Sequence, residues 1–265
     1  GAKVGQAVNY AADIKDGPLD HGFDQFYGIS ASLDMPPFVW IKDRRTTEIP
    51  SATKTWLRSG PAGPKFEAID VQPGLIDQAM AYVTAQKLSD PQKPFFIYLP
   101  LAAPHTPIVP TNEFKGSSGL NPYADFVRQV DADVGRLMAK LEQLGLRENT
   151  LIVFTSDNGG LPKVSQLDPL RGQKGSLFEA GVRVATCMRW PGRIKPGTTT
   201  GQTVMGMDMF PTMASIAGAK LPDGLKLDGV DLLDLMTENK KLPQRTLFWR
   251  FENDKAVRKG PWKLL

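Results

Sequence analysis

Apolar residues recur at helical spacing in three parts of the chain. Between residues 74 and 89 they fall on one face, as in a helix packed on a sheet. The longest stripe starts after Asn121, which we expect to cap the helix, with Pro122 in its first turn. Gly145 suits the end of that helix, and a third, shorter helix is expected over residues 208–217.

Short apolar runs predict the strands. Residues 94–99 and 151–154 are uninterrupted and rich in aromatic or branched side chains, which is typical of strands buried on both faces of a parallel sheet. Residues 184–190 are expected to form a further strand. Near the C-terminus, residues 246–251 and 256–258 look like short antiparallel strands. The succession of strands and helices indicates an α/β fold.

Composition adds few constraints. The 265 residues are 41% hydrophobic and 23% charged, with a net charge of +4. The longest basic cluster, at residues 42–45, is too short to indicate nucleic-acid binding, and no stretch reaches the length of a membrane span. Cys187 is the single cysteine, which excludes an internal disulfide, and its place in an expected strand predicts a buried, inert thiol.

Polar residues gather just after the strand expected at 151–154. Asp157 and Asn158 would lie beyond the carboxyl end of that strand, where ligands collect in open α/β sheets. Their oxygens are hard ligands suited to Ca²⁺, with Mg²⁺ as the alternative. Gly159 and Gly160 let the backbone turn away from such a site. The same residues are also those of an ordinary turn, so the sequence leaves both interpretations open here.

A lysine and a histidine complete the candidate chemistry. Lys174 lies in a glycine-containing loop, where its ammonium can approach an anion closely. His105 follows the expected strand at 94–99 and is flanked by Pro104 and Pro107, which keep it out of a helix. That position suits acid–base work, although a lone histidine is more often structural. The other histidine, His21, is expected to lie at the surface or to support the site indirectly, without a catalytic role.

Glu179 and Arg183 are four residues apart, and we expect them to form an ordinary helical ion pair with a structural role. The loop from Ser32 to Phe38, which contains Asp34 and two consecutive prolines, indicates no chemistry on its own.

These strings together resemble the sulfatase family. The resemblance rests on Thr155-Ser-Asp157-Asn158-Gly-Gly, on Leu-Arg-Gly-Gln-Lys174-Gly-Ser and on Pro104-His105-Thr-Pro, and extends over nearly the whole chain. It implies an alkaline-phosphatase-like sandwich with a mostly parallel central sheet flanked by helices. In that family the Asp-Asn pair ligates Ca²⁺, and the lysine and histidine bind the sulfate. One departure is Glu179-Ala-Gly, where the family usually has Glu-Gly-Gly.

The resemblance also implies that this chain is a fragment of a sulfuric ester hydrolase. The family nucleophile is a formylglycine made within Cys/Ser-x-Pro-Ser/Ala-Arg, and this sequence contains no such motif. We expect the chain to start at the last glycine of a Gly-Lys-Trp-His-Leu-Gly motif and to be inactive alone. Residues 1–241 would form the truncated α/β core, and residues 242–265 the opening of a small antiparallel C-terminal subdomain.

Two other interpretations remain. A two-zinc phosphoesterase of the same superfamily needs several histidines, and this chain has two; the related phosphonate hydrolases typically carry Asp-His-Gly at the position of Asp157. A non-catalytic binding module would keep the fold without the chemistry.

For the sulfatase, substrates are expected among aryl sulfates and sulfated sugars. The setting is expected to be periplasmic or extracellular, although no signal peptide is visible at Gly1. Exposed truncated sheet edges would favour self-association.

Overall fold

The computed structural model describes residues 8–265, which divide into two compact units. The first unit runs to Gly145 and the second from Leu146 to Leu265. The subdomain boundary expected near residue 242 stays a prediction, although an antiparallel sheet does begin at Thr246.

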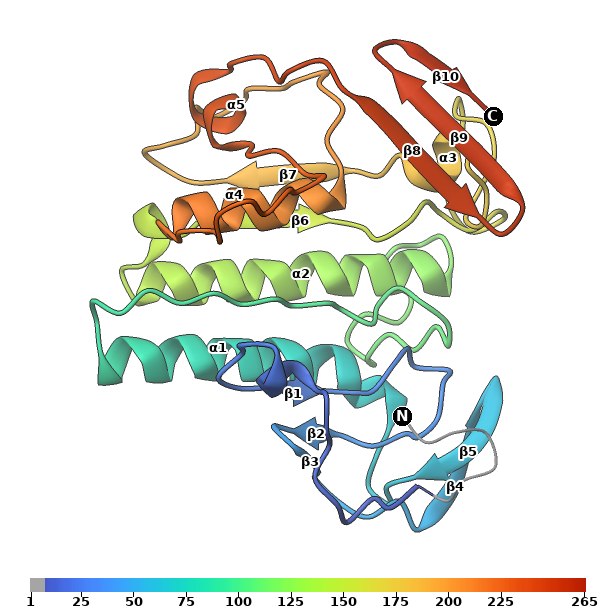
Figure 1. Ribbon diagram of the computed structural model, residues 1–265. Coiled ribbons are helices and arrows are strands. Elements are labelled where there is room, and N and C mark those ends of the chain that lie inside the picture. The colour runs from blue at the N-terminus through green and yellow to red at the C-terminus, as the bar shows by residue number, and fades with distance from the viewer. Residues whose placement is uncertain (1–7) are drawn as a thin grey trace. The chain divides into compact units, whose positions relative to one another are not determined.

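Two long helices form the centre of the first unit. Helix α1 (Val71–Ser89) lies alongside α2 (Pro122–Gln143), as Figure 1 shows. Polar side chains also join them, since Gln72 donates to Asp133 at 3.2 Å. Both helices were predicted, α1 beginning three residues earlier than expected. The Asn121 side chain accepts a hydrogen bond from the backbone amide of Ala124, as predicted for an N-cap.

Short strands and aromatic side chains complete the first unit. Its strands are β1 (Tyr27–Gly28), β2 (Ile41–Lys42), β3 (Arg45–Thr46), β4 (Ala52–Trp56) and β5 (Arg58–Ala62), and its 3₁₀ helices are Pro18–Asp20 and Ala68–Asp70. The core contains Leu33, Phe38, Phe66 and Phe126, each 2% exposed or less. Leu99, Leu101 and Ala102, on the approach to His105, pack against this core.

The second unit combines two small sheets with short helices. Its strands are β6 (Ile152–Thr155), β7 (Thr186–Arg189), β8 (Thr246–Phe251), β9 (Asp254–Lys259) and β10 (Trp262–Leu264). Its helices are α3 (Glu179–Val182), α4 (Met209–Ile216) and α5 (Leu233–Glu238), with 3₁₀ turns at Arg147–Asn149 and Gly206–Asp208. Strand β6 pairs with β7, and β9 lies between β8 and β10.

The expected mostly parallel central sheet is not confirmed. Every strand pairing in the described part of the chain is antiparallel, and the single parallel contact is an isolated bridge between Phe38 and Ala62. Strand β6 was expected to be buried on both faces, yet β7 is its partner and Phe154 is 41% exposed. The length of an apolar run was therefore a poor guide to strand pairing, because it reports hydrophobicity and not the direction of the neighbouring strand.

Two further expectations were wrong at these strands. Residues 94–99 form no paired strand, and their side chains alternate between exposed and half-buried. Cys187 is exposed and not buried.

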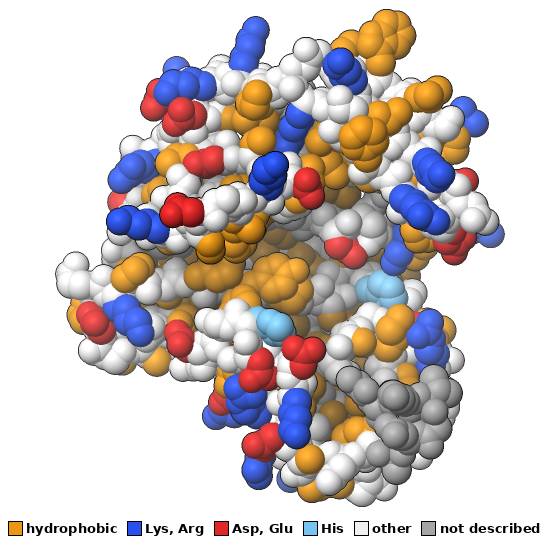
Figure 2. Space-filling view, viewed as in Figure 1, with side chains coloured by type: hydrophobic (Ala, Val, Ile, Leu, Met, Phe, Trp, Pro, Cys, Tyr) orange, Lys and Arg blue, Asp and Glu red, His pale blue; other side chains and the backbone are white. Residues whose placement is uncertain are grey.

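The described residues contain no helix that is long and apolar enough to cross a membrane. Charged side chains of both signs are scattered over the face seen in Figure 2, in keeping with the small net charge.

Candidate functional site

Strand β6 delivers the two candidate metal ligands of the second unit. Asp157 and Asn158 follow its last residue, Thr155, by two and three positions. The Ser156 hydroxyl donates to the carbonyl of Asn158 at 3.0 Å, which tightens this turn. Asp157 is exposed and Asn158 is half-buried, so their oxygens lie where an ion from solvent can reach them.

Backbone hydrogen bonds join this turn to the lysine loop. The amide of Gly159 donates to the carbonyl of Gly181 at 2.9 Å, and the amide of Lys174 donates to the carbonyl of Gly160 at 2.9 Å. The two sequence motifs, which are separated by more than ten residues, are therefore neighbours in one unit. This is the arrangement that the interpretation of these motifs as one site requires.

Close packing explains the glycines at this junction. A Cβ on Gly159 would lie 1.7 Å from the carbonyl oxygen of Ala180, and one on Gly181 would lie 2.0 Å from that of Ser176. Neither position has room for a larger side chain. We expected Gly159 to relieve crowding at a bound ion, but its neighbour is the backbone of α3.

Lys174 is held by a loop with a constrained backbone. Gly172 and Gly175 adopt φ values of 90° and 84°, which favour glycine over other residues. The guanidinium of Arg171 lies 4.1 Å from the ring centroid of Phe178, which adds a cation–π contact at the base of the loop. Lys174 itself is half-buried, and within residues 8–265 no carboxylate forms an ion pair with it. Its charge therefore stays available for an anion.

Glu179 anchors this loop to the C-terminal sheet. Its carboxylate accepts from the Lys263 ammonium at 2.9 Å and lies 3.5 Å from the Arg258 guanidinium. Burial alone would raise the pKa of Glu179, but these cations, with Arg183 nearby, hold the pKa below its usual value. The expected pairing of Glu179 with Arg183 is thus corrected: helix α3 ends at Val182, before Arg183, and the close partners come from β9 and β10.

The chemistry of Asp157 and Asn158 fits part of a calcium site. A carboxylate and an amide oxygen are the ligands that Ca²⁺ prefers, but this ion takes six to eight oxygens. No group of three His, Cys, Asp or Glu residues capable of holding a metal occurs in the described part of the chain. The pair fits Ca²⁺ only as part of a larger set of ligands.

His105 lies in the first unit, between two cis peptide bonds at Pro104 and Pro107. Its side chain is 36% exposed. Its Nδ1 atom lies 2.8 Å from the carbonyl oxygen of Thr106. Since the structure describes each unit by itself, the convergence of His105 with Asp157 and Lys174 stays a prediction.

Sequence reasoning missed one residue beside His105. Asp34 is 7% exposed, and its carboxylate lies 3.8 Å from His105 Nδ1 and 3.8 Å from Arg58 Nε. The Ser32 hydroxyl also donates to it. Burial acts to raise the pKa of Asp34, but the Ser32 hydrogen bond, its own backbone amide, and the charges of His105 and Arg58 outweigh burial and lower the pKa. Asp34 is therefore an ionised carboxylate facing the candidate histidine.

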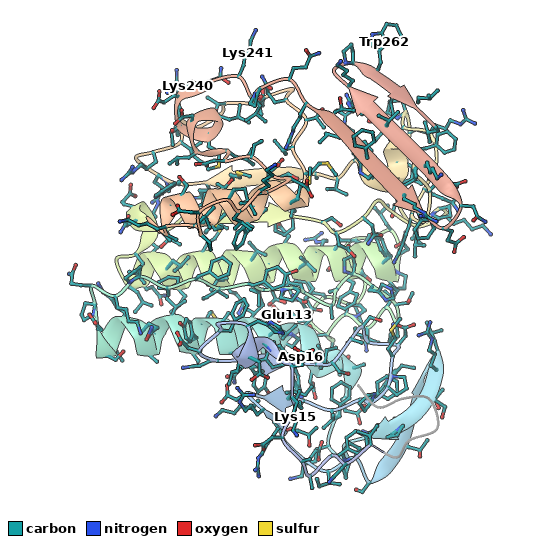
Figure 3. All side chains as sticks on the ribbon, in the orientation of Figure 1. Lys15, Asp16, Glu113, Lys240, Lys241 and Trp262 are labelled. Atoms are coloured by element: carbon teal, nitrogen blue, oxygen red, sulfur yellow. The ribbon has the colours of Figure 1, made fainter. Side chains whose placement is uncertain are left out.

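His21 lies at the surface, as expected. Its Nε2 atom contacts the Asp16 carboxylate at 2.9 Å, and the two side chains are 64% and 88% exposed. Asp16 is labelled in Figure 3.

Known proteins resemble this chain over most of its length. A family model described as Sulfatase matches residues 5–219. Rattus norvegicus N-acetylgalactosamine-6-sulfatase is 31% identical over 257 residues, covering 93% of this chain and 48% of the relative. Bos taurus arylsulfatase A is 34% identical over 273 residues, with coverage of 93% and 51%. The chain thus spans about half the length of these relatives.

Solved structures agree with this. A protein from a study of glycosaminoglycan metabolism by Bacteroides thetaiotaomicron superposes with a TM-score of 0.81 at 22% identity, covering 96% of this chain and 63% of its own. Ps i-CgsB in complex with k-i-k-neocarrahexaose gives a TM-score of 0.74 at 26% identity, with coverage of 93% and 58%. At 22% identity, the similarity to the Bacteroides thetaiotaomicron protein shows the fold alone.

Proposed function

The chain belongs to the sulfatase family, and we propose that it supplies part of the metal and sulfate site of a sulfuric ester hydrolase. Asp157 and Asn158 would ligate Ca²⁺, and Lys174 and His105 would bind the sulfate group. The observation that carries this proposal is the pair of backbone hydrogen bonds, Gly159 to Gly181 and Lys174 to Gly160, that joins the two motifs.

Each residue has a distinct role in this proposal. The Lys174 ammonium is a fixed positive charge that would stabilise negative charge on the sulfuryl oxygens. His105 would bind the sulfate from its exposed edge and help the leaving oxygen depart as a proton donor. Bound Ca²⁺ would supply Lewis-acid polarisation of the sulfate. The nucleophile would be a formylglycine, for which this sequence holds no motif.

The substrate class is proposed from the relatives. One relative is named for N-acetylgalactosamine-6-sulfate, and a similar structure was solved with a neocarrahexaose. We therefore favour a sulfated sugar over a small aryl sulfate as the natural substrate. Sugar sulfates of this kind suit a periplasmic or extracellular enzyme, which is the location we propose.

Because Asp157 and Asn158 supply only part of a ligand set, the chain should bind Ca²⁺ weakly. The metal role can be tested by titrating the chain with CaCl₂ in a calorimeter at concentrations high enough for the unaltered chain to show binding. Asp157→Asn should weaken Ca²⁺ binding by about tenfold or more, because the ion loses a carboxylate ligand. Asp168→Asn, at an exposed carboxylate of the same loop region, is the matched control and should leave binding unchanged. Equal binding by both variants would overturn the assignment of Asp157.

The sulfate role has its own test. Lys174→Met should reduce protection of the chain by sodium sulfate against thermal unfolding, whereas Lys195→Met, at an exposed lysine, should not. The unaltered chain should show no turnover of p-nitrophenyl sulfate, because the nucleophile motif is absent from its sequence. Robust, metal-dependent turnover would refute the proposal that this chain holds only part of the site.

A further inference from the structure

The buried carboxylate of Asp34 lies beside the one histidine to which a catalytic role is given. Of the three groups that contact it, Ser32 is a neighbour in sequence, while Arg58 and His105 come from β5 and from the segment after residue 99. Arg58 is 57% exposed and the Asp34 side chain 9% exposed, so the arginine faces water while the carboxylate is buried. A buried carboxylate costs free energy unless it is paired, which makes its placement informative.

The ring contacts of His105 determine where its proton lies. A carbonyl oxygen can only accept, so the 2.8 Å contact between Nδ1 and the Thr106 carbonyl requires a hydrogen on Nδ1. The Thr106 hydroxyl is farther away, at 3.4 Å from the same nitrogen. The Asp34 carboxylate, 3.8 Å from Nδ1, adds negative charge at this edge of the ring.

We propose that Asp34 is a positioning residue for His105: it favours the Nδ1–H form of the ring and so leaves Nε2 free for the substrate. Its charge attracts a positive N–H edge, and it cannot itself accept the hydrogen bond at 3.8 Å. With the Nδ1 hydrogen donated to Thr106, Nε2 is the basic atom of the neutral ring. It would take up a proton from solvent to form the imidazolium and then release that proton to the leaving oxygen of a sulfate ester. Asp34 acts through the histidine.

The catalytic use of His105 rests on the proposed function, but the contacts of His105 with Asp34 and Thr106 lie within the first unit. An exposed pair, His21 with Asp16, provides a built-in comparison, because its carboxylate is 88% exposed and therefore screened by water. The chain contains two histidines, so the ring signals of both can be followed in one spectrum.

The test is ¹⁵N NMR of the imidazole nitrogens in the chain labelled at histidine, at a pH where the rings are neutral. The Nδ1–H form of His105 should predominate in the unaltered chain. In Asp34→Asn, the ratio of Nε2–H to Nδ1–H should rise about tenfold, the factor that corresponds to about 1.4 kcal/mol. Asp16→Asn should alter the His21 signals and leave those of His105 unchanged.

Two outcomes would overturn the proposal: a predominant Nε2–H form in the unaltered chain, or an unchanged ratio in folded Asp34→Asn. Asp34→Glu keeps the charge but displaces it, and should give an intermediate ratio. It also decides the matter if the asparagine variant fails to fold, because an unchanged ratio there would count against the proposal. If Asp157→Asn and Lys174→Met had no effect on Ca²⁺ and sulfate binding, the proposed function would be contradicted. The imidazole ratios of His105 would still show whether Asp34 positions the ring.

Discussion

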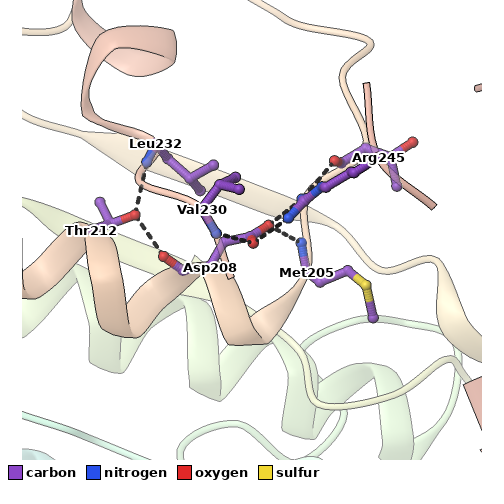
Figure 4. Close-up of polar contacts among 7 residues, drawn as sticks. Met205, Asp208, Thr212, Val230, Leu232 and Arg245 are labelled. Carbon is purple, nitrogen blue, oxygen red and sulfur yellow. Dashed lines mark hydrogen bonds and ion pairs between the residues drawn. The ribbon is translucent and has the colours of Figure 1, made fainter. Parts of the chain in front are cut away.

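Asp208 is fully buried in the second unit, and its carboxylate is satisfied by several donors (Figure 4). Arg245 donates to its two oxygens at 2.6 and 2.5 Å, and the backbone amides of Met205 and Val230 donate at 2.7 and 3.0 Å. The arrangement ties the start of α4 to the segment before β8. Thr212 extends it by donating to the Asp208 carbonyl at 2.6 Å.

Asp208→Asn should cost about 3–5 kcal/mol of unfolding free energy, because it leaves Arg245 partly buried without its counter-charge. Urea denaturation followed by tryptophan fluorescence would measure this. Asp234→Asn is the matched control, since the ion pair of Asp234 with Lys240 is exposed (60% and 57%; Lys240 is labelled in Figure 3). That variant should unfold like the unaltered chain, and equal losses in both would contradict the argument.

The same carboxylate should make stability depend on pH. Burial raises the pKa of Asp208, but the hydrogen bonds from Arg245, Val230 and Met205 outweigh it, so the pKa in the folded chain is lowered. The stabilisation is therefore complete above the unfolded pKa, about 3.9, and is lost as pH falls through the lower folded pKa. Urea midpoints measured between about pH 6 and pH 3 should fall less steeply for Asp208→Asn. Parallel curves would show that other carboxylates dominate.

At the residue level, the sequence motifs predicted the candidate site residues but not the residue that contacts one of them, Asp34. Asp157, Asn158 and Lys174 could be chosen from the sequence because each lies in a short string of distinctive residues. Their assignment to one site stays a prediction, supported by the hydrogen bonds between their loops. Asp34 could not be found this way, because its partner His105 is distant in sequence and the contact forms only on folding.

At the level of elements, the helices and the antiparallel C-terminal strands β8 and β9 were predicted well, whereas the pairing of the expected central sheet was not. Helix α2 has a polar cap, a proline and an apolar stripe, all of which act within a few residues of one another. Strand pairing depends on partners far along the chain: β6 pairs with β7, more than thirty residues away. Periodicity holds no information on that partner, which explains the error on the parallel sheet.

The cap of α2 can be tested separately from its core. Asn121→Ala should lower the unfolding free energy by about 1 kcal/mol, because the backbone amide of Ala124 loses its acceptor. Asn121→Asp keeps an acceptor and should lie close to the unaltered chain. Urea midpoints for the three proteins would decide, and a loss of the same size with aspartate would show that the cap is not the cause.

At the level of the whole molecule, self-association was expected through exposed sheet edges, but the local patterns did not reveal an exposed apolar face on the C-terminal sheet. In the C-terminal sheet, Phe248 and Leu264 are both aligned with Val257, and Trp262 lies two residues before Leu264, so these side chains share one face. Phe248 is 72%, Leu264 70% and Trp262 81% exposed. Figure 2 shows exposed apolar side chains in this part of the chain.

This face should make the 265-residue chain self-associate, since exposed apolar clusters of this kind mark interaction surfaces. The sedimentation coefficient should rise with protein concentration in analytical ultracentrifugation. Trp262→Lys should weaken association by about tenfold or more, because buried tryptophans dominate interface energies. Leu88→Lys, at an equally exposed position on α1 (79%), should have no such effect. A monodisperse monomer at all concentrations would contradict the expectation, whereas association that survives Trp262→Lys would point to the open edges of the β6–β7 sheet instead.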